Sequence, residues 1–166
     1  MLEAIMAKVQ STMFNEIYNN NAEDEDSTTY NLEDYDDIVA FELAASNKYI
    51  NNPVYLVSPT AASKLKTMTT TVFPVVFNGM INNHPVIETP FLEGEAIIYG
   101  DWSRLILGQF GGFDITVDKI TKSPQGVTKL IVNSWFDWDL LDANSFLYAT
   151  TEAASNEDEP VEPVEP

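Results

Sequence analysis

The order of the sequence patterns predicts an α+β fold, in which helices come first and mostly antiparallel strands follow. Three observations lead to this class. Apolar residues recur at three- and four-residue steps in two early segments, 2–19 and 32–47, as they do along one face of a helix. The dipeptide Ser58-Pro59 is a strong signal for a helix start. Downstream of residue 71, short apolar runs are separated by turns that contain Gly or Pro, which is typical of strands.

The first two helices are predicted from this spacing. Over 2–19 the apolar positions are Leu2, Ile5, Met6, Val9, Met13, Phe14 and Ile17. The second helix is predicted over 32–47, with Asn31 as its N-cap. Glu33 and Asp34 would lie in its first turn, where the helix dipole favours acids. The apolar positions of this second helix are Leu32, Tyr35, Ile38, Val39, Leu43 and Ala44.

A short strand and a third helix are predicted next. The strand covers 54–57 and consists of apolar residues throughout, as buried strands do. The helix covers 58–68, with the hydroxyl of Ser58 at the N-cap and Pro59 at the first helical position. Its apolar face is formed by Ala62, Leu65 and Met68.

The remaining strands are predicted between recognisable turns. The strands are expected at 85–88, 96–99, 105–107, 113–118 and 127–138. Asn78-Gly79 is a favourable turn pair, and Gly100-Asp101 is expected to turn the chain after a strand. Gly111-Gly112 is expected to form a second turn or a bulge. On the last strand, Leu130, Val132, Ser134, Phe136 and Trp138 alternate with Ile131, Asn133, Trp135 and Asp137, so the two sets face opposite ways.

The charge of the chain is strongly negative and unevenly spread. The 166 residues, enough for one ordinary domain, carry a formal net charge of −18. Residues 23–37 hold eight acids and residues 152–166 hold six, with no Lys or Arg in either segment. Without these fourteen acids, twelve acids face eight bases, so the rest of the chain is close to neutral. Nucleic-acid backbones are bound by clustered Lys and Arg, so we expect no direct nucleic-acid binding.

Several classes of site are excluded or disfavoured. The chain has no Cys, which excludes disulfides, zinc–thiolate sites and thiol catalysis. No apolar run approaches the about 18 residues that a membrane span needs, so no membrane partner is expected. The acids of 23–37 lack the spacing of a calcium-binding loop. The glycines match neither nucleotide-binding fingerprint, so no cofactor is expected.

Catalytic arrangements are also disfavoured. The single His, His84, precedes a Pro, and Ser103 does not lie in a Gly-x-Ser-x-Gly elbow, so a Ser-His-Asp hydrolase has little support. Asp137 and Asp139 flank Trp138, as in a sugar-binding strand of a glycosidase, but any half-buried strand shows this alternation. We therefore expect no enzyme, and no catalytic, cofactor-binding or metal-binding residue is assigned.

Four passages of the chain, taken in order, carry a resemblance to a known family. Residues 36–68 contain a helix, a strand, Ser-Pro and a second helix, and residues 81–119 contain a strand that leads through Gly-Asp-Trp to another strand. Residues 127–150 contain a long strand and the segment after it, and residues 1–22 a helix. Together they resemble the C-terminal part of a tailed-phage major capsid protein of the Hong Kong 97-type fold, which encapsulin shells also use. The resemblance covers about residues 1–150.

The resemblance implies a fold and a division into domains. It implies a Hong Kong 97-type axial domain with a remnant of the peripheral-domain helix and with the return strand. Residues 1–22 would be the helix remnant, residues 23–150 the axial domain plus return strand, and residues 151–166 a disordered acidic tail. The family's N-terminal arm and extended loop would lie upstream of Met1, so we expect a fragment that alone forms a monomer or a small oligomer.

The resemblance also implies a function. The chain would be the C-terminal part of a phage or prophage major capsid protein, a structural protein that forms capsomer contacts in an icosahedral head. It would be located in the virion and made in the cytoplasm of the bacterial host. Its partners would be copies of itself, and the candidate tip contacts are the loop 69–83 and the turn at 108–112.

A second hypothesis, from the residues alone, is a carbohydrate-binding or adhesion module that uses Trp102, Trp135 and Trp138. This hypothesis predicts an exposed aromatic row, because aromatic rings stack on sugar rings. The shell hypothesis instead predicts that Trp135 and Trp138 are at least partly buried against the helix at 2–19.

Overall fold

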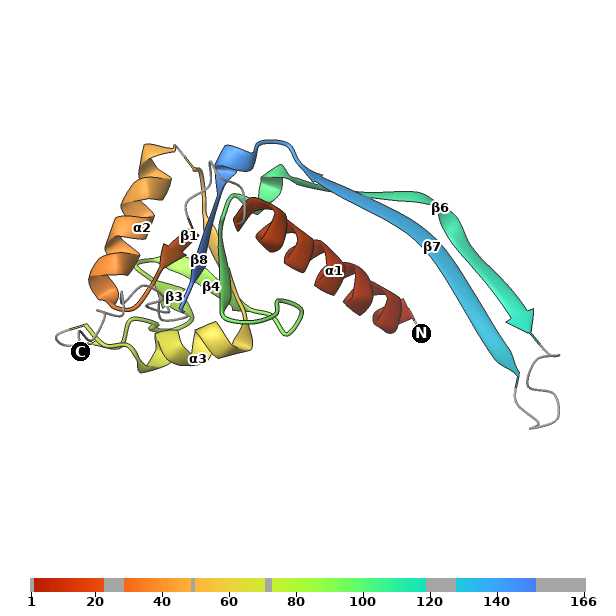
Figure 1. Cartoon of the computed structure of the whole chain (residues 1–166), viewed down its shortest axis with the longest axis horizontal. Helices are drawn as coiled ribbons and strands as arrows, with labels where there is room; N and C mark the ends of the chain where they lie inside the picture. The colour runs from red at the N-terminus through yellow and green to blue at the C-terminus, as the bar shows by residue number, and fades with distance from the viewer. Residues whose placement is uncertain (1, 23–28, 49, 71–72, 119–127, 152–166) are drawn as a thin grey trace, which may run out of the picture. The chain divides into compact units, whose positions relative to one another are not determined.

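A computed structural model describes residues 2–22, 29–48, 50–70, 73–118 and 128–151 of the chain (Figure 1). The chain divides into two compact units. Unit 1 comprises Met1–Asp101 and Asn144–Pro166, and unit 2 comprises Trp102–Ala143. Both helices and strands are present, so the predicted α+β class is confirmed. The predicted domain boundaries after residues 22 and 150 stay a prediction.

Within the described residues, unit 1 is built on a mixed sheet of six strands in the order β1-β8-β5-β2-β4-β3. In chain order these strands are β1 Thr29–Asn31, β2 Val54–Val57, β3 Met80–Ile81, β4 His84–Glu88, β5 Ala96–Gly100 and β8 Phe146–Thr150. β1 is parallel to β8 and β2 is parallel to β4, whereas the other neighbours are antiparallel. The predicted strands at 54–57, 85–88 and 96–99 are confirmed to within one residue at each end.

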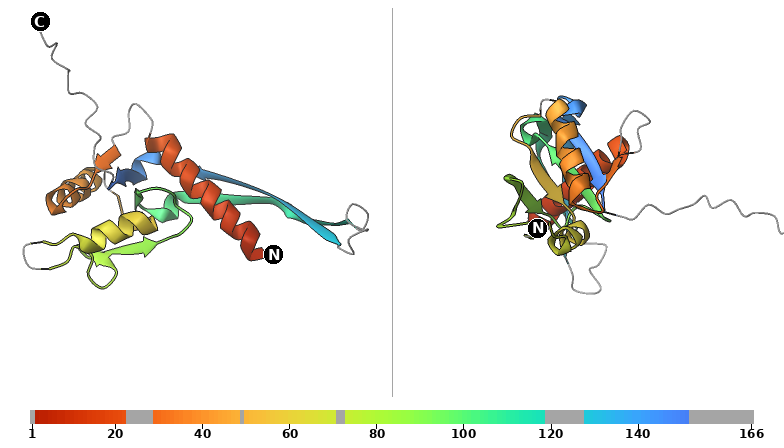
Figure 2. Two further views of the ribbon diagram at one scale, coloured as in Figure 1. Left: turned by 60° about the horizontal axis from the view of Figure 1, so that its bottom comes forward. Right: turned by 90° about the vertical axis from the view of Figure 1, so that its left-hand side faces the viewer.

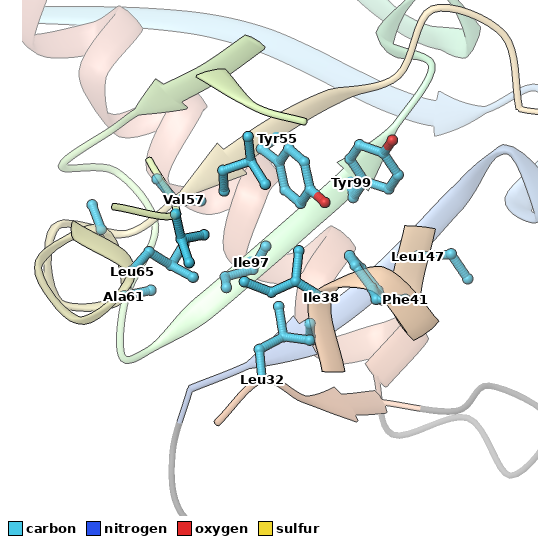
Figure 3. Packing of buried hydrophobic residues seen from close by; sticks show 14 of the residues in the cluster. Leu32, Ile38, Phe41, Tyr55, Val57, Ala61, Leu65, Ile97, Tyr99 and Leu147 are labelled. Carbon is cyan, nitrogen blue, oxygen red and sulfur yellow. The ribbon is translucent and has the colours of Figure 1, made fainter. Parts of the chain in front are cut away.

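Two helices, α2 Tyr35–Asn47 and α3 Pro59–Thr67, cover one face of this sheet (Figure 3). Tyr55 of β2 lies opposite Tyr99 of β5, and their rings stack with centroids 4.1 Å apart. Phe41 of α2 is fully buried, and its ring centroid lies 5.6 Å from that of Tyr99. Around these aromatic rings the core includes Leu32, Ile38, Val57, Ala61, Leu65, Ile97 and Leu147.

The third helix, α1 Leu2–Ala22, packs on the opposite face of the sheet, so the predicted helix at 2–19 is confirmed. The sheet residues on this face include Leu56, Ile98 and Tyr148, which are paired across β2, β5 and β8 and are buried. The ring of Tyr18 meets the ring of Tyr148 edge-on, with centroids 6.2 Å apart. The hydroxyl of Tyr18 donates a hydrogen bond to the carbonyl oxygen of Ala149 at 3.3 Å. Unit 1 therefore has three layers, with the sheet in the middle.

α2 begins later than predicted, because Asp34 rather than Asn31 is its N-cap. The Asp34 carboxylate accepts the amide of Asp37 at 3.0 Å, and the Asp37 carboxylate accepts the amide of Asp34 at 3.1 Å, which is a reciprocal capping box. Asn31 belongs to β1 instead, because residues 29–31 pair with β8. α3 begins as predicted, with the hydroxyl of Ser58 accepting a backbone amide and Pro59 as the first helical residue.

The central strand β8 was not predicted from the sequence. Four of its five residues are buried and belong to an apolar run, but no Gly or Pro bounds this run as Pro53 and Pro59 bound the one at 54–57. The backbone of Gly100, at the end of β5, lies close to Ser145 and Phe146 at the start of β8. A Cβ at Gly100 would collide with the carbonyl oxygen of Ser145 and lie 2.5 Å from Cδ1 of Phe146. The amide of Asp101 donates to the same Ser145 oxygen at 3.0 Å, so the Gly-Asp pair is a site of close backbone approach.

Unit 2 is a long antiparallel ribbon of β6 Leu105–Asp118 and β7 Lys129–Leu140, preceded by the 3-10 helix η1 Trp102–Arg104 (Figures 1 and 2). β6 is one strand, so the prediction of two strands at 105–107 and 113–118 is wrong. The pairing register shifts between Phe110 and Asp114, and Gly111 has a φ of 72°. Gly111-Gly112 therefore forms a bulge, and the predicted turn at 108–112 is wrong because β6 continues through it. β7 confirms the predicted long strand, which ends two residues later than expected.

The acidic segments are described only in part. Residues 23–28 and 152–166 lie outside the described residues, so the predicted tail is not tested beyond Thr151. Thr151 itself is buried, and its hydroxyl donates to the Glu95 carboxylate at 3.0 Å. Of the described helices, none is both long enough and apolar enough to span a membrane.

Candidate assembly surfaces

Two tight turns build the segment that was predicted to make tip contacts. Phe77 and Met80 pair through hydrogen bonds of 2.9 and 3.0 Å around Asn78-Gly79, whose φ angles are 53° and 72°. Ile81 and His84 pair around the next two residues, which have φ angles of 48° and 71°. Positive φ at both central positions is the geometry of a type I′ hairpin turn, which Asn and Gly adopt most readily. The predicted Asn-Gly turn is thus confirmed, and the segment has a fixed shape.

A carboxylate joins this segment to the rest of unit 1. Glu42 of α2 accepts a hydrogen bond from the side-chain amide of Asn82 at 2.8 Å and one from the hydroxyl of Tyr55, also at 2.8 Å. The hydroxyl of Tyr35 donates to the side-chain oxygen of Asn82 at 2.9 Å. Burial, with the Glu42 charge beside it, raises the pKa of Tyr55 far above its usual range. The Tyr55 hydroxyl therefore remains a donor to Glu42 at any ordinary pH.

The side chains that this segment presents to solvent are large and apolar. Phe73 is 65%, Phe77 60% and Met80 46% exposed. Val75 and Ile81, in contrast, are buried in the core and anchor the segment to unit 1. Residues 67–87 contain no Asp, Glu, Lys or Arg, although the whole chain has a net charge of −18. We call residues 73–83 the apolar tip.

A half-open cavity lies beside the outer surface of α2. Its volume is about 330 Å³, and it is lined by Val39, Glu42, Leu43, Ala45, Ser46, Ile50, Pro53, His84 and Tyr99. Val39 is 45% and Leu43 61% exposed. Both had been placed on the predicted buried face of this helix, whereas the buried residues of α2 are Ile38, Phe41 and Ala45. We call this cavity the α2 pocket.

One face of the β6-β7 ribbon is apolar. Residues opposite one another on an antiparallel pair point to the same face. The pairs on this face are Leu105–Leu140, Leu107–Trp138, Gln109–Phe136, Ile115–Val132 and Val117–Leu130. Leu107, Ile115, Val117 and Leu130 remain 44%, 60%, 49% and 50% exposed. Two-stranded ribbons are marginally stable alone, so this face is a candidate contact surface.

The opposite face of the ribbon carries acids and the most exposed tryptophan. Its acids are Asp114, Asp118, Asp137 and Asp139. Trp135 lies on this face, opposite Phe110, and is 58% exposed. Trp138 lies on the apolar face and is half-buried. Trp135 is thus more exposed than Trp138, and the expectation that both are at least partly buried against the helix at 2–19 stays a prediction.

The alternation of side chains along β7 places two aromatic residues of the predicted sugar site on different faces of the ribbon. Trp135 and Trp138 point to opposite faces of β7, so they do not form the row that the carbohydrate hypothesis predicted. Trp102 belongs to η1 and is half-buried. Asp137 and Asp139 point away from the face of Trp138, and each accepts the backbone amide of the residue that follows it, at 3.0 and 2.8 Å. No observation therefore supports a sugar-binding site.

The His and the Ser of the disfavoured hydrolase belong to different units. His84 begins β4 and presents its ring edge-on to Tyr99, with centroids 5.6 Å apart, whereas Ser103 lies exposed in η1 of unit 2. Where the structure describes the chain, no three His, Cys, Asp or Glu residues are grouped so as to hold a metal ion. In the described part of the acidic segment, Asp34 and Asp37 serve the helix cap.

Comparison with known proteins gives a family match and a likeness of fold. The family model described as Phage capsid family matches residues 7–151. No curated protein matches the chain. A solved chain from Gordonia phage Cozz has a TM-score of 0.63 at 16% identity, covering 92% of this chain and 61% of that one. For a chain from Mycobacterium phage Che8 the TM-score is 0.68 at 9% identity, with 90% and 60% covered.

A third structure, described as the capsid of an empty GTA particle with C5 symmetry, has a TM-score of 0.56 at 14% identity. It matches over 72% of this chain and 45% of that chain. At these identities the likeness concerns the fold. The present chain spans about three fifths of the length of the two phage chains, at 61% and 60%.

Proposed function

Because the chain belongs to the phage capsid family, we propose that it is part of a structural shell protein whose copies build the wall of an icosahedral phage or prophage head. The family match over residues 7–151 carries this proposal, since it covers both units of the structure. The chain would reside in the virion after synthesis in the bacterial cytoplasm. Its main partners would be further copies of itself.

The surfaces of the chain support a role in assembly. A soluble protein rarely exposes large contiguous apolar patches unless they meet a partner. Here the apolar tip exposes Phe73 and Phe77, and the ribbon exposes Ile115 and Leu130. We propose that both the apolar tip and the β6-β7 ribbon make contacts between copies within a capsomer.

The charge of the chain supports a wall that does not adhere to packaged genome. The net charge of −18 would repel a phosphate backbone. We expect no binding of duplex DNA by the purified chain at low salt in a gel-shift assay. A tight complex that weakens steeply with salt would contradict this part of the proposal.

The proposal is tested on particles purified from a culture that carries the gene. We expect peptides of this chain, detected by quantitative mass spectrometry, to be among the most abundant in the particle fraction. A shell protein is present in many copies, so its molar amount should exceed that of any minor particle protein. Intact particles that lack these peptides would contradict the proposal.

A further inference from the structure

We propose that the apolar tip of one copy inserts into the α2 pocket of the next copy, with Phe77 as the inserted side chain. This inference rests on the proposed function, because it names the contact through which copies of the shell protein meet. It adds a receiving site, on α2, that the sequence analysis did not identify.

The apolar tip is suited to insertion because it is rigid. Its two consecutive type I′ turns fix the backbone, and Asn82 is held by Glu42 and Tyr35 at 2.8 and 2.9 Å. A preorganised backbone segment loses little conformational freedom when it binds. Phe77 directly precedes the first turn and is 60% exposed. Phe73, four residues earlier in the same segment, is 65% exposed.

The α2 pocket is suited to receive an aromatic ring. Its volume is about 330 Å³, and a cavity of about 150 Å³ is large enough for benzene. Its lining is mixed: Val39, Leu43, Ile50 and Pro53 are apolar, whereas Glu42, Ser46 and His84 are polar. Among the described residues that line it, Glu42 is the only acid, and both oxygens of its carboxylate already accept hydrogen bonds from Tyr55 and Asn82. A phenyl ring can therefore enter without leaving this carboxylate unsatisfied.

The distribution of charge favours a second copy as the partner of the tip. Two copies each carry a net charge of −18, so acids brought close together at a contact would repel. The stretch 67–87 has no acid or base, so it is a part of the chain that identical copies can bring together without like-charge repulsion. A partner protein rich in Lys and Arg would instead be attracted to the acidic segments 23–37 and 152–166.

The contact joins two different patches of the same molecule. The tip residues do not line the α2 pocket of their own copy. A patch that fits a pocket elsewhere on an identical molecule makes a head-to-tail contact, which continues from copy to copy and closes into a ring when the rotation permits. Rings of this kind are what a capsomer requires.

Disulfide trapping tests the contact, because the chain has no Cys of its own. We would prepare the double variant Met80→Cys/Ser46→Cys, which places one thiol beside Phe77 and one in the pocket lining while Phe77 itself is kept, and each single variant, and oxidise them at high protein concentration. A disulfide requires Cα atoms within about 7 Å, so it forms only at a close contact. The double variant should give a ladder of covalent oligomers beyond the dimer. Each single variant has one thiol per chain and can give at most a dimer.

A matched pair of third substitutions makes the test specific. Val39→Asp places a charge in the pocket and should abolish the ladder. Ile87→Asp places the same charge at a residue of β4 that is 53% exposed and does not line the pocket, and should leave the ladder intact. Circular dichroism would check that both variants are folded.

The possible outcomes separate this inference from the proposed function. Monomers and dimers alone from the double variant would overturn the inference, even if the chain is abundant in purified particles. A ladder that persists with Val39→Asp would also overturn it, because the thiols would then meet outside the pocket. A ladder obtained from a chain that is absent from the particles would support the contact and contradict the shell function.

Discussion

Replacing Phe41 with Ala should remove a large part of the stability of unit 1. Phe41 is fully buried, and its ring contacts the rings of Tyr30, Tyr55 and Tyr99 with centroids 5.1, 6.4 and 5.6 Å away. A buried Phe→Ala change costs about 3–5 kcal/mol, and loss of aromatic pairs adds to the cost of lost burial. We expect about 4 kcal/mol, which is about a quarter or more of the free energy of unfolding of an ordinary domain.

The assay is urea unfolding followed by circular dichroism, with Leu43→Ala as the matched control. Leu43 lies two residues away on the same helix but is 61% exposed. Its truncation should change the free energy of unfolding by about 0.5 kcal/mol or less. Equal losses for the two variants, or a loss below about 1 kcal/mol for Phe41→Ala, would refute the assignment of the core to the inner side of α2.

Three further predictions follow from single contacts. Gly100→Ala should destabilise unit 1 by about 2 kcal/mol or more in thermal unfolding, because the new Cβ would collide with the carbonyl oxygen of Ser145. Asp34→Ala should cost about 1 kcal/mol in urea unfolding, since it removes the cap that pairs with Asp37. Above pH ~10 the free energy of unfolding should fall, because Tyr55 ionises in the unfolded state while its raised pKa keeps it protonated in the folded state.

Controls for these predictions lie within the chain. Gly108→Ala, whose new Cβ would have no neighbour closer than 3.7 Å, should leave the melting temperature nearly unchanged. Asp34→Ser, which restores an oxygen at the N-cap, should recover most of the loss. Below pH ~10 the Tyr55 contribution should be constant, so a loss of stability that starts well below that pH would point to a different group.

The sequence predicted the local elements well where a strong signal was present. Ser58-Pro59 marked the start of α3, Asn78-Gly79 marked a turn, and apolar spacing marked α1. The start of α2 was predicted three residues too early, because Asn31 is an equally good cap in isolation. Only its pairing with β8, more than 100 residues away, places it in a strand.

Features created by tertiary structure were missed. β8 was missed because its apolar run, unlike the one at 54–57, is not bounded by Gly or Pro. Gly111-Gly112 was expected to turn the chain or to bulge, and the choice depends on whether β7 continues to pair beyond it, which it does. The α2 pocket brings Val39 and Leu43 together with Pro53, His84 and Tyr99 from three other segments, so no local pattern could reveal it.

The central claim is that this chain is a building unit of an icosahedral shell, and cryo-electron microscopy of the purified particles tests it most directly. We predict that the wall contains repeated copies of the six-stranded sheet of unit 1, with α2 and α3 on one face and α1 on the other, arranged around the symmetry axes. A particle wall resolved to side-chain detail in which this sequence cannot be placed would contradict the account.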